Sequence, residues 1–407
     1  MLPLDGVRVI DLSNVLAGPF CGYQLARLGA EVIKVENPDG GDLARRLGAD
    51  PEMARRHMGL SFVAVNAAKQ SVAINLKDAR GRDVFLDLAG QADIVLENFR
   101  PGVMERLGLG YDVLAAHNPR LVYCAISGFG QTGPWADRPA YDQIVQGLSG
   151  VMSITGDART APLRAGFPLS DTIGGLTAAF AISAALVEQR TSGRGRLIDV
   201  SLLEATLATM GWVVSNFLNG GVTPRPMGNE NATAAPSGTF RTASGPLNIS
   251  ANEQKQFAAL CDLIGRPDLT ADPRFAERNA RKENREALRA LVEEGLAARP
   301  AEEWEALLNR RGVPAGRVLS VPEVLAQPHL RDRGFIETLP GDAALQVTRP
   351  GFRLDEDFSP PPAPPELGAD TRDWLLRLGY GAGAIDALVR DGVVAVRSPE
   401  PRMECCA

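Results

Sequence analysis

The sequence predicts an α/β protein: a Rossmann-like large domain with a parallel sheet, plus a smaller inserted α+β domain. Short β-rich runs alternate with helical patterns through the first half of the chain, which is typical of parallel strands joined by crossover helices. The composition changes after Gly220-Gly221, where glycines and prolines cluster, and such clusters mark boundaries. A third segment of strands and a helix near the C-terminus indicates a return to the first domain.

The elements of the large domain follow from its hydrophobic patterns. Strands are expected at residues 7–12, 31–36, 71–75, 92–96, 121–126 and 193–201, and helices at 19–28, 80–89, 172–187 and 202–218. Glu36 ends the second strand, where dinucleotide-binding proteins place a ribose-binding acid. The turn from Ser13 to Pro19, however, lacks the glycines of the G-x-G-x-x-G fingerprint, so NAD binding is excluded.

The domain boundaries follow from the same reading. We expect residues 1–220 to form the first part of the large Rossmann-like domain, 221–318 the inserted domain, 319–396 the return to the large domain, and 397–407 a disordered tail. Within the insertion, 247–251 is a predicted strand and 274–310 a run of amphipathic helices with solvated charges. The return contains a predicted strand at 346–348 and a helix at 371–378.

Composition restricts the partners and the compartment. The net charge of −6 gives no basic footprint for nucleic acid. Five cysteines and three histidines show no metal-ligand spacing, so we expect no metal. The N-terminus lacks a secretory pattern, and the most apolar helix, 172–187, is predicted to be too short for a bilayer and to be buried core. These features indicate a reduced, cytoplasmic protein without a membrane partner.

Asp171 is the main candidate for chemistry. It lies between a strand-like run and the apolar helix, in the segment from Gly166 to Gly175. An aspartate there is expected to cap the helix with its side-chain oxygen, and the helix dipole would keep the carboxylate ionised. Most capping aspartates only cap, but an ionised carboxylate is also a nucleophile. The segment by itself leaves both roles open.

Five blocks of sequence, taken together, resemble class III CoA-transferases of the CaiB/BaiF type, the family that includes formyl-CoA transferase. The blocks are Leu4–Pro19, Leu28–Glu36, Glu97–Gly102 with Arg106, Tyr141-Asp142, and Asp171. The resemblance is strong from Leu4 to about Ala205 and weaker from Asn248 to Val318. It implies a large domain built from both chain ends, a smaller inserted domain, and an interlocked homodimer.

The resemblance also implies a mechanism, because Asp171 matches the family's catalytic aspartate. Its carboxylate would attack an acyl-CoA thioester to give a mixed anhydride and then an aspartyl-CoA thioester, from which CoA passes to an acceptor acid. This chemistry needs an ionised, partly desolvated carboxylate and donors for the oxyanion, for which the backbone at Gly174-Gly175 is a candidate. CoA enters as a substrate, and no tightly bound cofactor is expected.

The family's CoA-binding segments match a second set of positions. These positions are Ile74, Lys77, Asn98, Phe99, Arg100, Arg106, Arg138 and Tyr141. Lysine and arginine suit phosphate groups, while Asn98 and Phe99 would line the pocket by hydrogen bonding and packing. Each has an ordinary alternative, because a surface cation usually faces solvent and an aromatic residue after a strand is usually core.

Departures from the family pattern bear on specificity. Leu16 stands where formyl-CoA transferase has a glutamine, which disfavours oxalate-like substrates. The glycine-rich lid of that enzyme has no clear counterpart, and residues 227–238 occupy the corresponding region. We expect a short dicarboxylate acceptor of the succinate or mesaconate type. Candidates for binding its distal carboxylate are Arg45, Arg46, Arg55 and Arg164, although each is otherwise a surface charge.

Two alternative functions remain at this point. An α-methylacyl-CoA racemase-like enzyme needs a base on each face of its substrate, and those relatives carry histidine where this chain has Tyr141. A tyrosine is a poor base near neutral pH. A non-catalytic CoA-binding protein would be indicated by loss of Asp171 or of the basic residues, and neither is lost. The sequence therefore favours the transferase.

Overall fold

The computed structural model describes residues 1–341, 344–355 and 359–397. Contacts divide the chain into two compact units. The large unit comprises Met1–Val151, Ala165–Gly221 and the described residues from Arg333 onward, and the small unit comprises Met152–Arg164 and Val222–Asp332. The small unit thus takes in 152–164, tied to it by a Gly228 N–H bond to the Gly156 carbonyl (2.7 Å). The predicted tail lies outside the described residues beyond Arg397.

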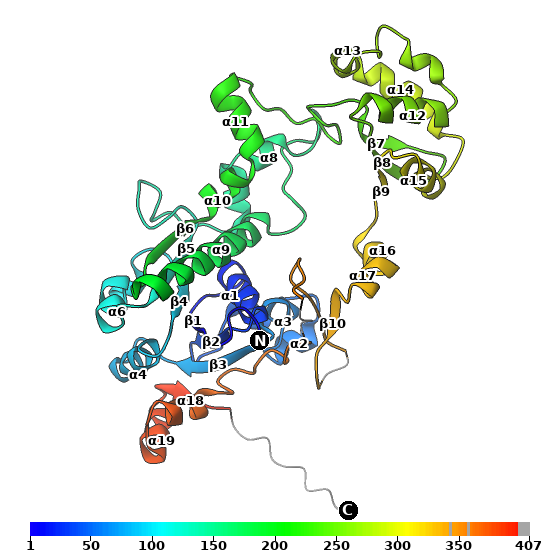
Figure 1. The fold of residues 1–407 in the computed structure, drawn as a ribbon. Coiled ribbons are helices and arrows are strands. Elements are labelled where there is room, and N and C mark those ends of the chain that lie inside the picture. Colours follow the sequence, from blue (N-terminus) through cyan, green and yellow to red (C-terminus); the bar gives the residue numbers. More distant parts are fainter. Residues whose placement is uncertain (342–343, 356–358, 398–407) are drawn as a thin grey trace, which may run out of the picture. The chain divides into compact units, whose positions relative to one another are not determined.

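A seven-stranded sheet forms the centre of the large unit, in the order β12-β3-β2-β1-β4-β5-β6 (Figure 1). Every pairing among β1 to β6 is parallel, and β12 pairs antiparallel with β3. The predicted α/β class with a parallel sheet is confirmed. The strands are β1 Arg8–Asp11, β2 Glu31–Glu36, β3 Lys69–Ile74, β4 Ile94–Glu97, β5 Val122–Ser127, β6 Leu197–Ser201 and β12 Val394–Ala395.

The strand order places a topological switch point between β1 and β4. From β1 the chain moves outward through β2 and β3, then returns to add β4, β5 and β6 on the other side. In open parallel sheets, ligands bind outside the carboxyl ends of the strands at such a reversal. The loops after β1 and β4 therefore mark where a site is expected.

Helices cover both faces of this sheet, because successive strand residues point to opposite sides. Ile10 joins a core cluster with α4, α18 and α19, while Val9 joins another with α1, α9 and α10. The helices are α1 Ala17–Arg27, η1 Leu43–Arg46, α2 Pro51–Arg55, α3 Leu60–Asn66, α4 Ala79–Ala89, α5 Val103–Arg106, α6 Tyr111–His117, α7 Asp142–Leu148, α9 Leu169–Ser192, α10 Leu202–Thr209, α11 Gly211–Gly220, α18 Thr371–Arg377 and α19 Ala382–Arg390.

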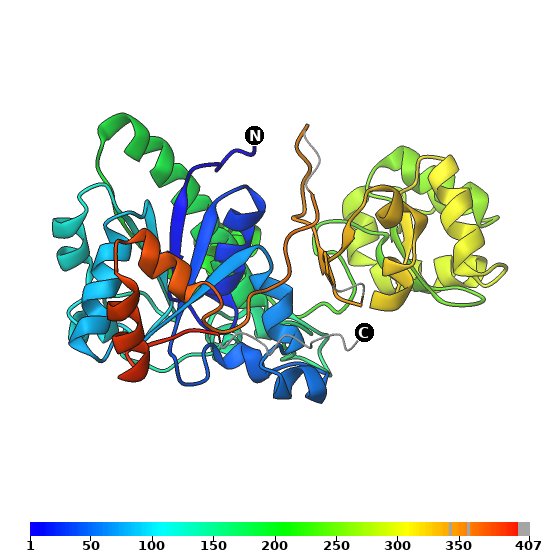
Figure 2. The same cartoon turned by 90° about the horizontal axis from the view of Figure 1, so that it is seen from below.

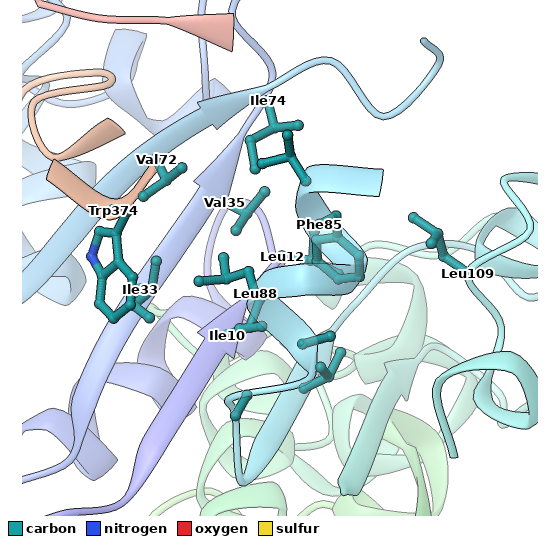
Figure 3. Packing of buried hydrophobic residues seen from close by; sticks show 14 of the residues in the cluster. Ile10, Leu12, Ile33, Val35, Val72, Ile74, Phe85, Leu88, Leu109 and Trp374 are labelled. Atoms are coloured by element: carbon teal, nitrogen blue, oxygen red, sulfur yellow. The ribbon is translucent and has the colours of Figure 1, made fainter. Parts of the chain in front are cut away.

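The C-terminal segment completes the large unit. Trp374 of α18 packs among Ile33, Val72 and their neighbours (Figure 3), and Figure 2 shows α18 and α19, in orange to red, beside the N-terminal strands. A hairpin of β10 (Ile336–Thr338) and β11 (Gln346–Thr348) also belongs to this unit. It is fastened to α1 by a buried ion pair between Arg27 and Glu337 (2.7 Å).

The helix α9 is longer than predicted, with 24 residues from Leu169 to Ser192. It ends at Gly193, which has the left-handed φ of +69° that favours glycine at a helix C-terminus. By length and composition it could cross a membrane, so the prediction that it is too short was wrong. Core helices have the same properties, and α9 buries Gly174, Ala178 and Ile182 within the large unit.

The small unit has its own core around a three-stranded antiparallel sheet, β7-β8-β9. Leu288, Val292 and Leu296 line one face of α14 at intervals of four and are buried, so the predicted amphipathic pattern is confirmed there. The elements are β7 Ser237–Arg241, β8 Pro246–Ser250, β9 Ala315–Arg317, α12 Gln254–Leu263, η2 Pro267–Thr270, α13 Arg278–Glu283, α14 Arg285–Leu296, α15 Ala301–Arg310, α16 Val321–Leu325 and α17 Pro328–Asp332, while α8 Val151–Ile154 spans the boundary between the units.

Candidate active site

Asp171 lies in the first turn of α9 and is partly buried. It does not cap this helix, so the predicted capping role was wrong. The helix begins two residues earlier, at Leu169, and the cap comes from α7: Asp142 Oδ1 accepts the backbone N–H groups of Ser170 (2.8 Å) and Asp171 (3.3 Å). A cap supplied by a distant helix cannot be read from the local sequence.

Asp142 is itself held by the next turn of α7. Its Oδ2 accepts a hydrogen bond from Gln146 Nε2 (2.7 Å), and both residues are buried. Gln146 also donates to the Phe167 carbonyl (3.2 Å) and accepts the Ala165 N–H (2.9 Å). This Asp142–Gln146 brace fixes the segment that leads into Asp171.

The environment of Asp171 favours its protonated form more than the sequence suggested. Burial, and secondly the negative charge of Asp142, raise the pKa of Asp171 to about 7. The expectation of a firmly ionised carboxylate was wrong, because the helix N–H donors that would have stabilised it are taken by Asp142. In the described part of the chain no hydrogen bond or ion pair engages the Asp171 carboxylate. It is therefore available to react, with a pKa suited to neutral pH.

The helices α1 and α9 touch one turn after Asp171. A Cβ on Gly175 would lie 2.5 Å from the Ala17 carbonyl oxygen, and one on Gly174 would lie 2.2 Å from Leu202 Cδ2. Helical residues four apart share a face, so Asp171 and Gly175 face the segment that enters α1. Both glycines lie inside α9, where N–H groups bond within the helix, so they serve close packing rather than an oxyanion.

Asn98 and Phe99 follow β4 at the switch point. The Asn98 amide accepts the Asn14 N–H and donates to the Asn14 carbonyl, both at 2.8 Å. Phe99 packs against the core cluster, and its N–H bonds to Glu97 Oε2 (2.7 Å). The side chain of Asn98 is thus occupied by the loop after β1, which sequence reasoning did not foresee.

The remaining predicted CoA residues also follow the carboxyl ends of strands. Ile74 ends β3 and is buried in the core (Figure 3). Three exposed cations, Lys77 after β3, Arg100 after β4 and Arg106 on α5, form no ion pair among the described residues. Such cations are free to meet phosphate.

Arg138 and Tyr141 precede α7 and are also exposed. The Arg138 guanidinium lies over the Trp135 ring, 4.6 Å from its centroid. Tyr141 is 72% exposed, immediately before the buried Asp142. The segment after β5 therefore offers a cation and two aromatic rings beside the Asp142–Gln146 brace.

The four arginines predicted as candidates for binding an acceptor carboxylate differ in burial and in their ion pairs. Arg45 is fully buried, and its guanidinium bonds both oxygens of Glu36 at 2.7 Å, so that prediction was wrong. Both carboxylate oxygens of Glu36, the residue whose position resembles that of a ribose-binding acid, are therefore bonded by Arg45. Arg55 pairs with Glu52 on the surface, and Arg164 lies in the small unit. Arg46 is exposed in the large unit.

Further residues near the site were missed. Glu97 ends β4, and burial raises its pKa to about 7. Asp42 and Lys34 form a buried ion pair (2.9 Å) beneath the loop after β1. The pairing of Asp142 with Gln146 could have been predicted from the sequence, since residues four apart on a helix are neighbours. No sequence pattern predicts the role of Asp42. No group of three His, Cys, Asp or Glu side chains in the described residues is placed to hold a metal.

Leu16 and the segment expected to hold a lid lie in different units of the structure. Leu16 is partly buried against an apolar cluster that includes Tyr23, Val63 and Leu339. The segment 227–238 belongs to the small unit and runs into β7.

The described part of the chain is thus an α/β protein with a partly buried carboxylate at Asp171 and exposed, unpaired cations after β3 and β4. The profile of CoA-transferase family III matches residues 4–371, and the chain belongs to this family. It is therefore an acyl-CoA transferase of that class.

Named relatives and a solved structure agree. The chain is 42% identical to an acetyl-CoA:oxalate CoA-transferase of Acetobacter aceti, covering 82% of this chain and 85% of the relative. It is 36% identical to a succinyl-CoA:glutarate CoA-transferase of Mus musculus, covering 97% and 91%. The crystal structure of a CAIB/BAIF family protein from Brucella suis superposes with a TM-score of 0.82 at 35% identity, covering 93% of this chain and 99% of that one.

Proposed function

We propose that this enzyme moves CoA from an acyl-CoA donor to a carboxylic acid through covalent intermediates on Asp171. The observation that carries the proposal is the Asp171 carboxylate itself: partly buried, with a pKa raised to about 7, and not engaged by any described side chain. Carboxylates serve as nucleophiles when they are held in place and partly desolvated. The substrates are proposed to bind beside the loops that follow β1 and β4.

The steps balance without a net proton. An Asp171 oxygen attacks the thioester carbonyl, the C–S bond breaks, and CoA thiolate leaves a mixed anhydride. The thiolate then attacks the Asp171 carbonyl carbon and releases the donor acid, giving an aspartyl-CoA thioester. The acceptor carboxylate attacks this thioester and frees the thiolate, which takes the acceptor's acyl group and restores the carboxylate. The energy of the thioester is thus kept in covalent bonds.

We propose that Lys77, Arg100 and Arg106 bind the phosphate groups of CoA. All three are exposed and follow the carboxyl ends of β3 and β4, where a parallel sheet binds ligands. For the acceptor we propose a short dicarboxylic acid, since the two named relatives act with oxalate and glutarate. Arg46 is the remaining candidate in the large unit for its distal carboxylate.

We also propose that the enzyme works as a homodimer in the cytoplasm. Leu176, Phe180 and Val187 expose 49%, 76% and 67% of their surface along one stripe of α9. The helix α11, which follows α10 in the chain, buries no residue and exposes 85% of Trp212. Large exposed apolar surfaces mark interaction sites, and a second copy of the chain is the proposed partner. The cytoplasmic location rests on the use of free, buried cysteines.

Replacing the nucleophile tests the mechanism directly. We expect Asp171→Ala to lower the kcat of CoA transfer at least about 10³-fold, with the dissociation constant of CoA little changed. Hydroxylamine should trap an activated Asp171 during wild-type turnover. Asp112→Ala, in the first turn of α6 and exposed, is the control and should keep the wild-type rate. Transfer by Asp171→Ala at the wild-type rate would show the mechanism to be wrong.

The racemase and binding-protein alternatives yield different readings in the same assays. Turnover in deuterium oxide distinguishes a racemase from a transferase, because a racemase exchanges the hydrogen on the carbon beside the thioester for deuterium. CoA binding without any transfer identifies the second. Tyr141, which is exposed, stands where racemases of this fold carry histidine, so we expect transfer without exchange.

A further inference from the structure

The loop Ser13–Leu16, which joins β1 to α1, leads into the close contact between α1 and α9, one turn along α9 from Asp171. It lies at the switch point of the sheet and runs directly into Ala17, whose carbonyl approaches Gly175 of α9. We refer to it as the β1–α1 loop.

The backbone of the β1–α1 loop is held by side chains instead of by a helix or sheet. Asn98 bonds both the N–H and the carbonyl of Asn14 at 2.8 Å. Asp42 Oδ1 accepts the Val15 N–H at 2.9 Å. Two successive residues of the loop, Asn14 and Val15, are thus bonded by side chains from outside it.

Two further side chains hold Ser13. Lys34 Nζ donates to the Ser13 carbonyl at 2.7 Å, and Asp11 Oδ1 accepts the Ser13 N–H at 2.9 Å. Lys34 also pairs with Asp42 at 2.9 Å, and both side chains are fully buried. The supports are therefore joined to one another beneath the loop.

This support maintains a strained backbone. Val15 has φ +66°, a left-handed conformation that a β-branched residue adopts only when its surroundings impose it. Strain of this kind collects at ligand sites, where it preorganises the backbone. Asp42 bonds the N–H of the strained residue itself, and Asn98 that of the residue before it.

We propose that Asn98 and Asp42 are positioning residues for CoA transfer. They hold the β1–α1 loop in the conformation that positions the donor thioester for attack by Asp171. The proposal rests on the proposed function and assigns Asn98 to the loop rather than to CoA. Near-attack geometry is sensitive to displacements of about 1 Å, which cost about 10²-fold in rate. A loosened loop should therefore slow transfer while CoA still binds.

The chain offers a matched control for Asn98. The Asn118 side chain bonds three backbone groups where that of Asn98 bonds two: it donates to the Ala89 and Ala92 carbonyls and accepts the Arg120 N–H. It precedes β5, at the opposite end of the strands from the switch point. Asn98→Ala and Asn118→Ala remove similar bonds, but only the first lies at the site.

The test compares these variants in three measurements. Asn98→Ala should lower kcat about 10- to 100-fold, keep the dissociation constant of CoA alone within about threefold of wild type (a change under about 1 kcal/mol), and speed hydrogen exchange of the Asn14 amide. Asn118→Ala should keep kcat within about twofold despite a similar loss of stability. Asn98→Asp retains the acceptor for the Asn14 N–H and serves if the alanine variant fails to fold; its kcat should be intermediate.

Two results would overturn the proposal. One is equal kcat for folded Asn98→Ala and Asn118→Ala. The other is an Asn98→Ala enzyme with wild-type kcat and CoA binding weakened more than about tenfold, which makes Asn98 a direct CoA ligand. Neither concerns the nucleophile: failure of the proposed function appears as transfer by Asp171→Ala, whatever Asn98 does.

Discussion

At the scale of single residues, the proposed role of Asp171 as the nucleophile predicts that its protonation controls the rate of transfer. Desolvation, and then repulsion from Asp142, raise its pKa from 3.8 to about 7. The ionised form is the nucleophile, so the rate of transfer should rise with pH and level off above about 7. A rate that stays constant from pH 5 to pH 8 would contradict this assignment.

Asp142→Asn separates the two causes of the raised pKa. Removing the negative charge should lower the pH midpoint of transfer by roughly one unit, while burial keeps it above the ordinary aspartate value. The amide oxygen can still accept the Ser170 N–H, so α9 keeps part of its cap. Initial rates between pH 5 and pH 9 measure the shift, with Asp112→Asn as the control. An unmoved midpoint would show that Asp142 does not act on Asp171 through its charge.

The sequence located Asp171 but not its chemical state. Its place before an apolar helix was readable, and the family resemblance gave it a role. Its pKa depends on burial and on Asp142, a residue of another helix. Arg45 failed as a predicted ligand for the same reason, because its partner Glu36 meets it only after the chain turns back between them. Contacts made by folding, rather than residue types, decided both cases.

At the scale of elements, the crossing of α1 and α9 sets the distance between the β1–α1 loop and Asp171. Gly175→Ala should push α1 away, because the new Cβ would lie 2.5 Å from the Ala17 carbonyl oxygen. Overpacking of this kind costs about 1–3 kcal/mol, so we expect a lower Tm and slower transfer. Thermal unfolding and kcat together check it.

Gly383→Ala, in α19, is the control for this prediction. A Cβ at Gly383 meets nothing within 4 Å, so this variant should keep both the stability and the activity of the wild type. A Gly175→Ala enzyme as stable and active as Gly383→Ala would show that the close crossing is not required.

Elements with a strong local pattern were predictable. The strands β2 and β11 fall at the expected residues, 31–36 and 346–348, because β-branched and apolar side chains are bounded there by turn residues. The start of α9 was misplaced by three residues because its cap belongs to α7. The strands β10 and β12 were not predicted, since each is very short and is defined by its pairing partner.

At the scale of the whole molecule, the exposed stripe on α9 predicts association. Phe180→Asp should convert the proposed dimer into monomers, because a charge would be buried at an apolar interface. Sedimentation velocity checks this against the chain mass of 43.4 kDa. Val113→Asp, at an exposed apolar position on α6 outside the stripe, is the control and should leave the assembly unchanged. A wild-type enzyme that sediments as a monomer would contradict the proposal.

The pairing of β12 with β3 bears on how the chain is made. The last described strand joins the edge of a sheet whose other members come from the first half of the sequence, and Trp374 packs in a core whose buried residues outside the C-terminal segment all precede residue 130. During translation, the N-terminal strands leave the ribosome with that edge and that apolar face uncovered, and they stay so until Trp374 and β12 have emerged as well. The small unit, whose residues end at Asp332, is complete before then. The central sheet is thus completed after the small unit, and a chain that stops before β12 carries an open edge prone to aggregation.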